Sequence, residues 1–193
     1  MDKQHNVDTD RRAALVEAAA GVFIRFGFRK TSMDEVARAA CLSRQGLYFH
    51  FSTKEELFRE VVRHLAGAVL ESLTTALARR DLGLEERLHA AFMAMHVCTF
   101  GGHDSAHVQE LFGSAAELCP KIVHDLEESI IAALAREMSG APRAALPARA
   151  MAEHIYATAY GFKLRGLSRQ EYSTCMKKAV RIVCAAQTNK GTQ

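Results

Sequence analysis

Apolar residues recur every three to four positions along most of this chain, which is the spacing of one face of an α-helix. The pattern predicts longer helices over about residues 10–26, 53–80, 84–100, 104–112, 120–138, 147–164 and 168–187. No stretch alternates apolar and polar positions as a strand does, and no segment repeats. With the two short helices described next, we expect an all-α fold of about nine helices.

One stretch, TSMDEVARAACLSRQGLYFHFSTKEEL, contains three helix starts in close succession. Ser32 with Glu35 and Ser52 with Glu55 each form the Ser-x-x-Glu pattern of a capping box, and Ser43 is a third N-cap. A short helix, a turn of three or four residues and a second short helix make a helix-turn-helix arrangement. The second helix of such a pair can lie in the DNA major groove.

The predicted second helix carries side chains suited to DNA. Arg44 can bind guanine and Gln45 adenine, while Tyr48 and His50, with Lys54 just beyond, suit phosphate oxygens. Three apolar side chains are expected to anchor the helix inward: Leu47, Phe49 and Phe51. The core of this N-terminal domain is expected to comprise Phe23, Phe26, Met33, Val36, Leu47, Phe49 and Leu57. The alternative is an ordinary helical pair, since many such pairs never meet DNA.

Several residues at fixed spacing also resemble a known family. They are Phe26, Gly27 and Thr31, then Val36-Ala37, Ser43, the run Leu47-Tyr48-Phe49-His50-Phe51, and Lys54 ahead of Leu57. Together with the preceding LVEAAAGVFIRFGFRKT, they are similar to the N-terminal domain of the TetR/AcrR family of transcriptional regulators. The close match covers about a quarter of the chain. The family usually has Gly where this chain has Cys41, and a positive φ at a non-Gly residue costs on the order of 1 kcal/mol.

The resemblance implies two domains and a function. Residues 10–56 would form the helix-turn-helix DNA-binding domain and residues 57–187 a helical domain for effector binding and dimerisation, with a disordered tail at 1–9 and a frayed end at 188–193. A long helix is expected to join the two domains. The expected protein is a homodimeric regulator, a repressor, that binds a palindromic operator in double-stranded DNA and is released by a small, largely apolar effector.

Three sets of site residues follow from these arguments. The DNA-binding set is Thr31, Ser32, Ser43, Arg44, Gln45, Gly46, Tyr48, His50 and Lys54. The effector pocket is expected to be lined by Phe92, Met95, His96, Phe100, Phe112, Tyr156 and Tyr160, although any one of these could be an ordinary core residue. The dimer interface is expected to use Ile155, Ala159, Phe162, Tyr172, Met176, Val180 and Val183.

Composition narrows the function classes. The net charge of +3 is mild, and no apolar run reaches the roughly 20 residues of a membrane span. The polar N-terminus lacks the apolar core of a signal peptide, so a cytoplasmic protein is expected. No catalytic motif is found, so neither an enzyme nor a cofactor is expected.

A competing interpretation is a thiol- or metal-responsive regulator. The chain has five cysteines without a CxxC pair, which are typical of small buried residues in a cytosolic protein. His103 and His107 are four residues apart, the spacing of two ligands on one helix face. Two histidines alone do not define a metal site, and none is assigned.

Overall fold

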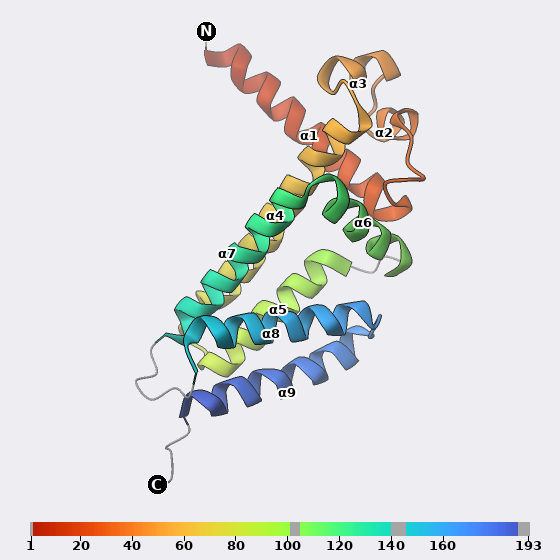
Figure 1. Ribbon diagram of the computed structural model, residues 1–193. Helices are drawn as coiled ribbons and strands as arrows, with labels where there is room; N and C mark the ends of the chain where they lie inside the picture. The colour runs from red at the N-terminus through yellow and green to blue at the C-terminus, as the bar shows by residue number, and fades with distance from the viewer. Residues whose placement is uncertain (1, 101–104, 140–145, 189–193) are drawn as a thin grey trace. The chain divides into compact units, whose positions relative to one another are not determined.

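The computed structural model describes residues 2–100, 105–139 and 146–188, and within these ranges the chain forms nine α-helices and no strand (Figure 1). Their bounds are α1 Asp2–Phe26, α2 Met33–Ala39, α3 Arg44–His50, α4 Lys54–Leu77, α5 Leu84–Phe100, α6 Ser105–Leu118, α7 Pro120–Met138, α8 Ala148–Leu164 and α9 Arg169–Thr188. The all-α prediction is confirmed.

The helices form two compact units. The first unit comprises Met1–Gly67 and Gly102–Val123, and the second comprises Ala68–Gly101 and His124–Gln193. The division therefore falls inside α4 and inside α7, and not at the boundary expected near residue 56. The first unit also takes in α6, because one face of that helix packs into the first unit's core.

An aromatic cluster fills the centre of the first unit. Phe23, Phe51 and Phe58 are fully buried, and the rings of Phe23 and Phe58 meet edge to face with centroids 5.2 Å apart. Five of the seven expected core residues are buried: Phe23, Met33, Val36, Leu47 and Leu57. The prediction was wrong for Phe26 and Phe49, which are 40% and 85% exposed, because both lie on the outward side of their helices.

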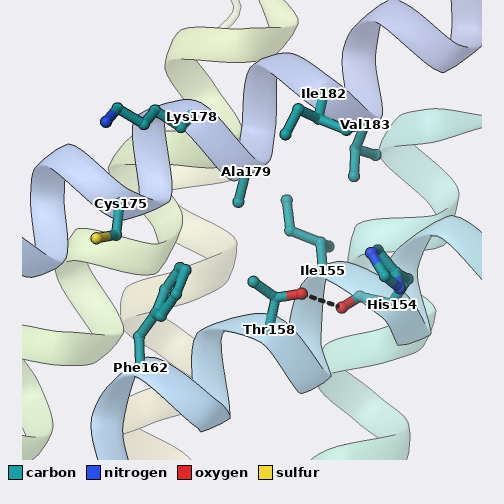
Figure 2. A pocket seen from close by; sticks show the side chains of 9 residues that line it. All are labelled: His154, Ile155, Thr158, Phe162, Cys175, Lys178, Ala179, Ile182 and Val183. Carbon is teal, nitrogen blue, oxygen red and sulfur yellow. Dashed lines mark hydrogen bonds between the residues drawn. The ribbon is translucent and has the colours of Figure 1, made fainter. Parts of the chain in front are cut away.

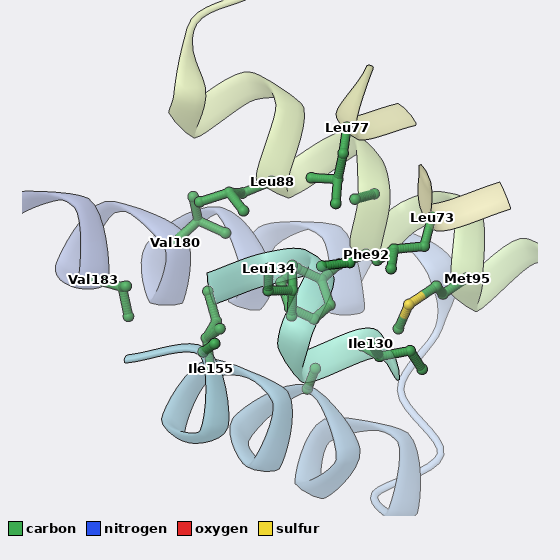
Figure 3. Packing of buried hydrophobic residues seen from close by; sticks show 14 of the residues in the cluster. Leu73, Leu77, Leu88, Phe92, Met95, Ile130, Leu134, Ile155, Val180 and Val183 are labelled. Carbon is green, nitrogen blue, oxygen red and sulfur yellow. The ribbon is translucent and has the colours of Figure 1, made fainter. Parts of the chain in front are cut away.

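The second unit has its own apolar core, centred on Phe92 of α5 (Figure 3). Leu73 and Leu77 of α4, Leu134 of α7 and Val180 of α9 surround this ring and are buried. Helix α9 packs against both α5 and α8. These contacts fix the inward faces of the last two helices.

Four local predictions differ from the structure. Helix α1 already begins at Asp2, where a disordered tail was expected, because no Pro or Gly interrupts the first residues. Helix α6 continues to Leu118, beyond the end expected near residue 112, and the burial of Ala115 and Cys119 in the first unit's core explains this. Thr188, the first residue of the expected frayed end, still belongs to α9, and 189–193 lie outside the described residues.

The fourth difference is the start of α4. The Glu56 N–H donates to the Thr53 hydroxyl at 3.0 Å, and the Ser52 N–H donates to the Glu56 carboxylate at 2.8 Å. The cap is therefore shifted by one residue from the expected pair of Ser52 and Glu55. By contrast, Ser168 and Glu171, a further Ser-x-x-Glu pair of the sequence, do form a capping box at the start of α9.

Candidate nucleic-acid interface

Helices α2 and α3 are each started by a serine. The Ser32 hydroxyl accepts a hydrogen bond from the Glu35 N–H, and the Glu35 carboxylate accepts one from the Ser32 N–H, which completes the predicted capping box. The Ser43 hydroxyl accepts from the Gly46 N–H at 3.0 Å, as expected of an N-cap. Both short helices thus begin where the sequence predicts, because these bonds satisfy otherwise unpaired N–H groups.

The link between the two helices turns at Cys41, which has a φ of 55°. It is the one non-glycine residue with a positive φ in the described ranges. The expected left-handed conformation is therefore present although the family's usual glycine is absent. The positive φ strains the backbone at Cys41, and the Cys41 side chain is exposed at the surface of the turn.

Helix α3 has one inner and one outer face. Leu47 is fully buried and holds the helix on the first unit's core, with Phe51 buried directly after the helix. Arg44, Gln45 and Tyr48 are exposed on the outer face. Seven residues thus supply one anchor and a polar surface, as a DNA-reading helix requires.

Arg44 is oriented by its neighbours in the free protein. Its guanidinium donates to the Asp34 carboxylate of α2 at 3.2 Å and lies 5.6 Å from the centre of the Tyr48 ring. The pKa of Arg44 is raised by a hydrogen bond with Tyr48 and by the Asp34 charge. The arginine therefore stays charged, and its side chain is exposed.

The loop between α1 and α2 is held from two sides. On one side, the Glu110 carboxylate of α6 accepts hydrogen bonds from the N–H groups of Phe28 at 2.7 Å and Arg29 at 3.1 Å. On the other, the Lys54 ammonium donates to the carbonyl groups of Phe28 at 3.0 Å and Thr31 at 3.1 Å. Gly27 has a φ of 79°, and a Cβ there would lie 2.1 Å from the Glu110 carboxylate, so only glycine fits.

The end of α3 is fixed by Arg12 of α1. Its guanidinium donates to the His50 carbonyl at 2.8 Å and lies 4.3 Å from the centre of the Phe51 ring. Nothing in the periodicity of the chain indicated this contact, because it joins residues that are far apart in sequence. Arg12 therefore belongs to the framework that positions the candidate interface.

The predicted DNA-binding residues fall into two groups. Arg44, Gln45 and Tyr48 are exposed, and His50 is half-buried. The others also have structural partners: Ser32 and Ser43 cap helices, and Lys54 uses two of its three N–H groups on the loop. Thr31 is buried, and its hydroxyl donates to the Gly27 carbonyl at 2.7 Å.

Sequence reasoning missed one surface residue of α3. Phe49 was expected to point inward, yet it is the most exposed of the large apolar side chains in the described chain. Because aromatic rings can contact the methyl group of thymine, Phe49 joins the candidate interface. The period of 3.6 residues could have found it, since Phe49 lies two positions from the buried Leu47.

The residues expected to line an effector pocket do not all come together. Phe92, Met95 and His96 are buried in the second unit and Tyr156 is half-buried there, whereas Phe112 belongs to the first unit. Tyr160 is half exposed, and the side chain of Phe100 lies outside the described set. Burial raises the pKa of Tyr156 to about 12, with the Glu127 charge adding to the effect.

An apolar groove of about 230 Å³ runs between α8 and α9 (Figure 2). Its lining follows one stripe on each helix: His154, Ile155, Thr158 and Phe162 from α8, and Cys175, Lys178, Ala179, Ile182 and Val183 from α9. Of the residues expected at a dimer interface, Ile155, Phe162 and Val183 line this groove. The other four, Ala159, Tyr172, Met176 and Val180, are buried inside the protomer and face its own core.

The described residues also bear on the metal and membrane questions. Within that part of the chain, no group of three or more His, Cys, Asp or Glu side chains could hold a metal ion. His107 is half-buried in α6, whereas His103 lies outside the described residues. All five cysteines are free thiols. No helix in the described ranges is long and apolar enough to cross a bilayer.

The capped pair α2 and α3, held on a third helix and presenting a polar α3 surface, defines a helix-turn-helix protein. Residues 15–61 match the sequence model described as "Bacterial regulatory proteins, tetR family". The N-terminal domain of this chain therefore belongs to this family.

Known relatives agree with this assignment. The HTH-type transcriptional activator FasR of Mycolicibacterium smegmatis is 34% identical over 131 residues, which are 61% of this chain and 58% of that protein. Other curated relatives are named as repressors. The chain spans about half the length of the first curated relatives that it matches, FasR among them.

Solved structures share the fold over most of the chain. A transcriptional regulator from Rhodococcus sp. Rha1 superposes with a TM-score of 0.74 at 22% identity, covering 90% of this chain and 96% of the other. AibR, solved in complex with isovaleryl coenzyme A and operator DNA, superposes with a TM-score of 0.61 at 21% identity, covering 86% and 96%. At these identities the likeness concerns the fold alone.

Proposed function

We propose that this protein is a ligand-responsive transcriptional repressor that binds a palindromic operator as a homodimer and is released by a small, largely apolar effector. The observation that carries the proposal is the outer face of α3. Arg44, Gln45 and Tyr48 are exposed together on a helix whose one buried residue is Leu47. A short helix with one buried residue and this outer surface suits the major groove.

The proposed DNA-binding residues divide into those that contact base edges and those that contact phosphates or fix the helices. Arg44 and Gln45 read base edges, with Arg44 exchanging the Asp34 carboxylate for a guanine. Tyr48 and His50 bind phosphate oxygens, as do the ends of the helices that Ser32, Ser43 and Gly46 shape. Lys54 has one N–H group left for a phosphate, and the buried Thr31 acts through the loop that it closes.

A second copy of the chain is proposed to cover the groove between α8 and α9. Ile182 is 68% exposed there, and the rest of the lining is mainly apolar. A single short reading helix contacts few base pairs, so specific binding needs two copies on related half-sites. A two-fold interface on the last two helices supplies the second copy, and the family resemblance favours the same helices.

The effector is proposed to bind in the second unit, whose core is built from aromatic and sulfur-containing side chains such as Phe92 and Met95. AibR, a structural neighbour, was solved with both an acyl-coenzyme A and operator DNA. An effector can release DNA only by the difference in its affinity for the bound and free shapes of the protein. Some relatives are named as activators and others as repressors. We propose repression because an effector that releases the regulator from its operator would directly allow transcription.

The proposal is tested by selecting sequences from a random double-stranded DNA pool with the full-length protein. We expect a two-fold symmetric sequence, bound with an affinity that falls as salt rises because counterions are released. Arg44→Ala should weaken the selected site by about tenfold to a hundredfold and relax preference at one position in each half-site.

Arg149→Ala is the matched control, because Arg149 is an exposed arginine of α8 that pairs with Glu128 and Glu153. It should leave DNA binding unchanged. Enrichment of no sequence, or equal binding by the Arg44 variant, would remove the proposed function. A reporter gene placed behind the selected site then distinguishes a repressor from an activator. Deletion of a repressor should raise reporter expression.

A further inference from the structure

An acidic residue lies against the arginine that is proposed to read bases. Asp34, in the first turn of α2, accepts a hydrogen bond from Arg44, the first residue of α3, with 3.2 Å between the carboxylate oxygen and the guanidinium nitrogen. Both side chains are more than half exposed, Asp34 at 52% and Arg44 at 63%. A surface that binds DNA gains nothing from an acid as such, because the phosphates repel it. The position of Asp34 therefore needs an explanation.

Helix capping explains the neighbouring acid but not Asp34. The Glu35 carboxylate is turned back onto the start of α2, where the N–H and the hydroxyl of Ser32 donate to it at 2.7 and 2.9 Å. These bonds account for an acid at this position of the helix. The Asp34 carboxylate takes no part in this capping box and reaches across to α3 instead.

The contacts of Arg44 hold its guanidinium in place. Asp34 accepts from one nitrogen, and the Tyr48 ring, one turn along α3, has its centre 5.6 Å from the guanidinium carbon. An exposed ion pair adds little to stability, because water screens it and two side chains must be ordered. Its consequence for DNA binding is larger, since the nitrogen that Asp34 holds binds DNA only after the carboxylate has released it.

Two parts of DNA favour this release to different extents. A phosphate replaces the carboxylate by another oxyanion, so the exchange gains little, and it leaves the Asp34 charge beside the negative backbone. A guanine offers two acceptors, O6 and N7, in the geometry that a guanidinium fits, and a base carries no net charge. The exchange is therefore more favourable at a guanine than on an arbitrary sequence. Repulsion of the wrong partner is one of the ways in which a binding site becomes specific.

We propose that Asp34 is a specificity-determining residue, which keeps Arg44 from binding DNA phosphates and releases it to guanine. Asp34 thereby weakens binding to arbitrary sequences more than binding to the operator. This inference rests on the proposed function, because it concerns how the same surface distinguishes an operator from other DNA. It adds a residue of α2 to a site whose proposed base contacts all lie on α3.

The test compares the full-length wild-type protein with Asp34→Asn by fluorescence anisotropy on two duplexes: the sequence selected from the random pool, and a scrambled version of it. The variant should bind the scrambled duplex about threefold to tenfold more tightly, and its affinity for the selected duplex should change by less than about threefold. On the scrambled duplex, the salt dependence of the variant should become steeper by about one phosphate contact, because the released Arg44 now binds a phosphate.

Glu17→Gln is the matched control, because Glu17 is an exposed acid of α1 in the same unit. It removes the same charge, so it should change the affinities for both duplexes alike and leave the salt dependence unchanged. In an Arg44→Ala background, Asp34→Asn should affect the scrambled duplex no more than Glu17→Gln does. An acid in the first turn of a helix can also stabilise that helix, but this structural role does not depend on Arg44.

Two results overturn the inference. One is an Asp34 variant that keeps the wild-type ratio of the two affinities, and the other is an effect of Asp34→Asn that persists in full without Arg44. Circular dichroism verifies the fold, and Asp34→Ser provides the same comparison if Asp34→Asn does not fold. A wild-type protein that selects no sequence removes the proposed function and this inference with it. A selected sequence together with an unchanged ratio removes only the role of Asp34.

Discussion

Cys41 takes up the left-handed conformation that the chain needs between α2 and α3, with a φ of 55°. A side chain with a Cβ is strained there by roughly 1–2 kcal/mol, whereas glycine is not. The strain persists because the capped helices on either side fix where the turn begins and ends.

Cys41→Gly should therefore stabilise the protein. The relief of strain is offset in part by the greater freedom of glycine in the unfolded chain, so we expect a gain of about 0.5–1 kcal/mol. Urea unfolding followed by circular dichroism measures the gain. Cys41→Ala keeps the Cβ and should change little, and equal stability of the two variants would contradict the explanation.

Phe49 shows the opposite case, a large apolar residue that contributes little to the core. Because its side chain is 85% exposed, Phe49→Ala should change the free energy of unfolding by less than about 0.5 kcal/mol. The same variant should bind the selected operator about threefold to tenfold more weakly, through lost contact with a thymine methyl group.

Leu146→Ala is the matched control for Phe49→Ala, because Leu146 is also exposed, at 54%, and belongs to the second unit. Fluorescence anisotropy with labelled operator DNA measures both variants. Full operator affinity in the Phe49 variant would mean that the ring lies outside the interface.

His96 makes the stability of the second unit depend on pH. Its pKa falls from 6.5 to about 4, first through burial and then through the charges of Lys163 and Arg169. Because the unfolded chain binds this proton more readily, protonation favours unfolding, and stability is lost as the pH falls from about 6.5 towards 4.

We expect this histidine to lower the free energy of unfolding by about 2 kcal/mol between pH 7 and pH 5. His96→Gln should remove that part of the pH dependence, as read from urea unfolding at several pH values. Identical pH profiles of the variant and the wild-type protein would show that the His96 pKa is not lowered.

At the scale of elements, the loop between α1 and α2 depends on two other helices. Glu110 of α6 binds its N–H groups and Lys54 of α4 binds its carbonyl groups, so the start of α2 is fixed from both sides. These bonds explain why a lysine expected to bind phosphate is half-buried. They also explain why α6 belongs to the first unit.

Lys54→Met should lower the free energy of unfolding by about 1–2 kcal/mol, because two charge-assisted hydrogen bonds to carbonyl groups are lost. Lys30→Met is the control, since Lys30 is an exposed lysine of the same loop. Thermal and urea unfolding compare the two. If Lys54→Met weakened DNA binding without any loss of stability, Lys54 would be a phosphate contact alone.

At the scale of the whole molecule, the proposed function needs two copies of the chain. The groove between α8 and α9 exposes an apolar stripe that the protomer's own core leaves uncovered, with Ile182 as its most exposed large apolar residue. Apolar surface of this kind favours association, whereas a charge in its centre opposes it.

Ile182→Asp should therefore convert a dimer into a folded monomer and weaken operator binding by at least tenfold. Multi-angle light scattering gives the mass, and circular dichroism verifies the fold. Thr174→Asp adds the same charge to an exposed position of α9 that does not line the groove, and it should remain dimeric. A dimer of unchanged stability in the Ile182 variant would place the interface elsewhere.

The sequence by itself determined the helices and their starts. Periodicity and capping depend on neighbours three or four residues away, so Ser32, Ser43 and Ser168 indicated helix starts that the structure confirms. The same local rules gave the helix-turn-helix, whereas the positive φ at Cys41 was considered only because the resembled family usually has glycine there. The proposed reading surface around Arg44 followed from the residue types of one short helix.

Tertiary structure decided which face of each helix is buried. In α9, one stripe with Tyr172 and Met176 packs inside the protomer, while the adjacent stripe with Cys175 and Ile182 stays open. Both stripes follow the same period, so the sequence could not tell core from partner surface. Likewise, Phe51 lies just after α3 and is buried, and it contacts a distant residue, Arg12, that no local pattern indicates. Periodicity is a property of neighbours in the chain, whereas burial depends on which elements meet in space.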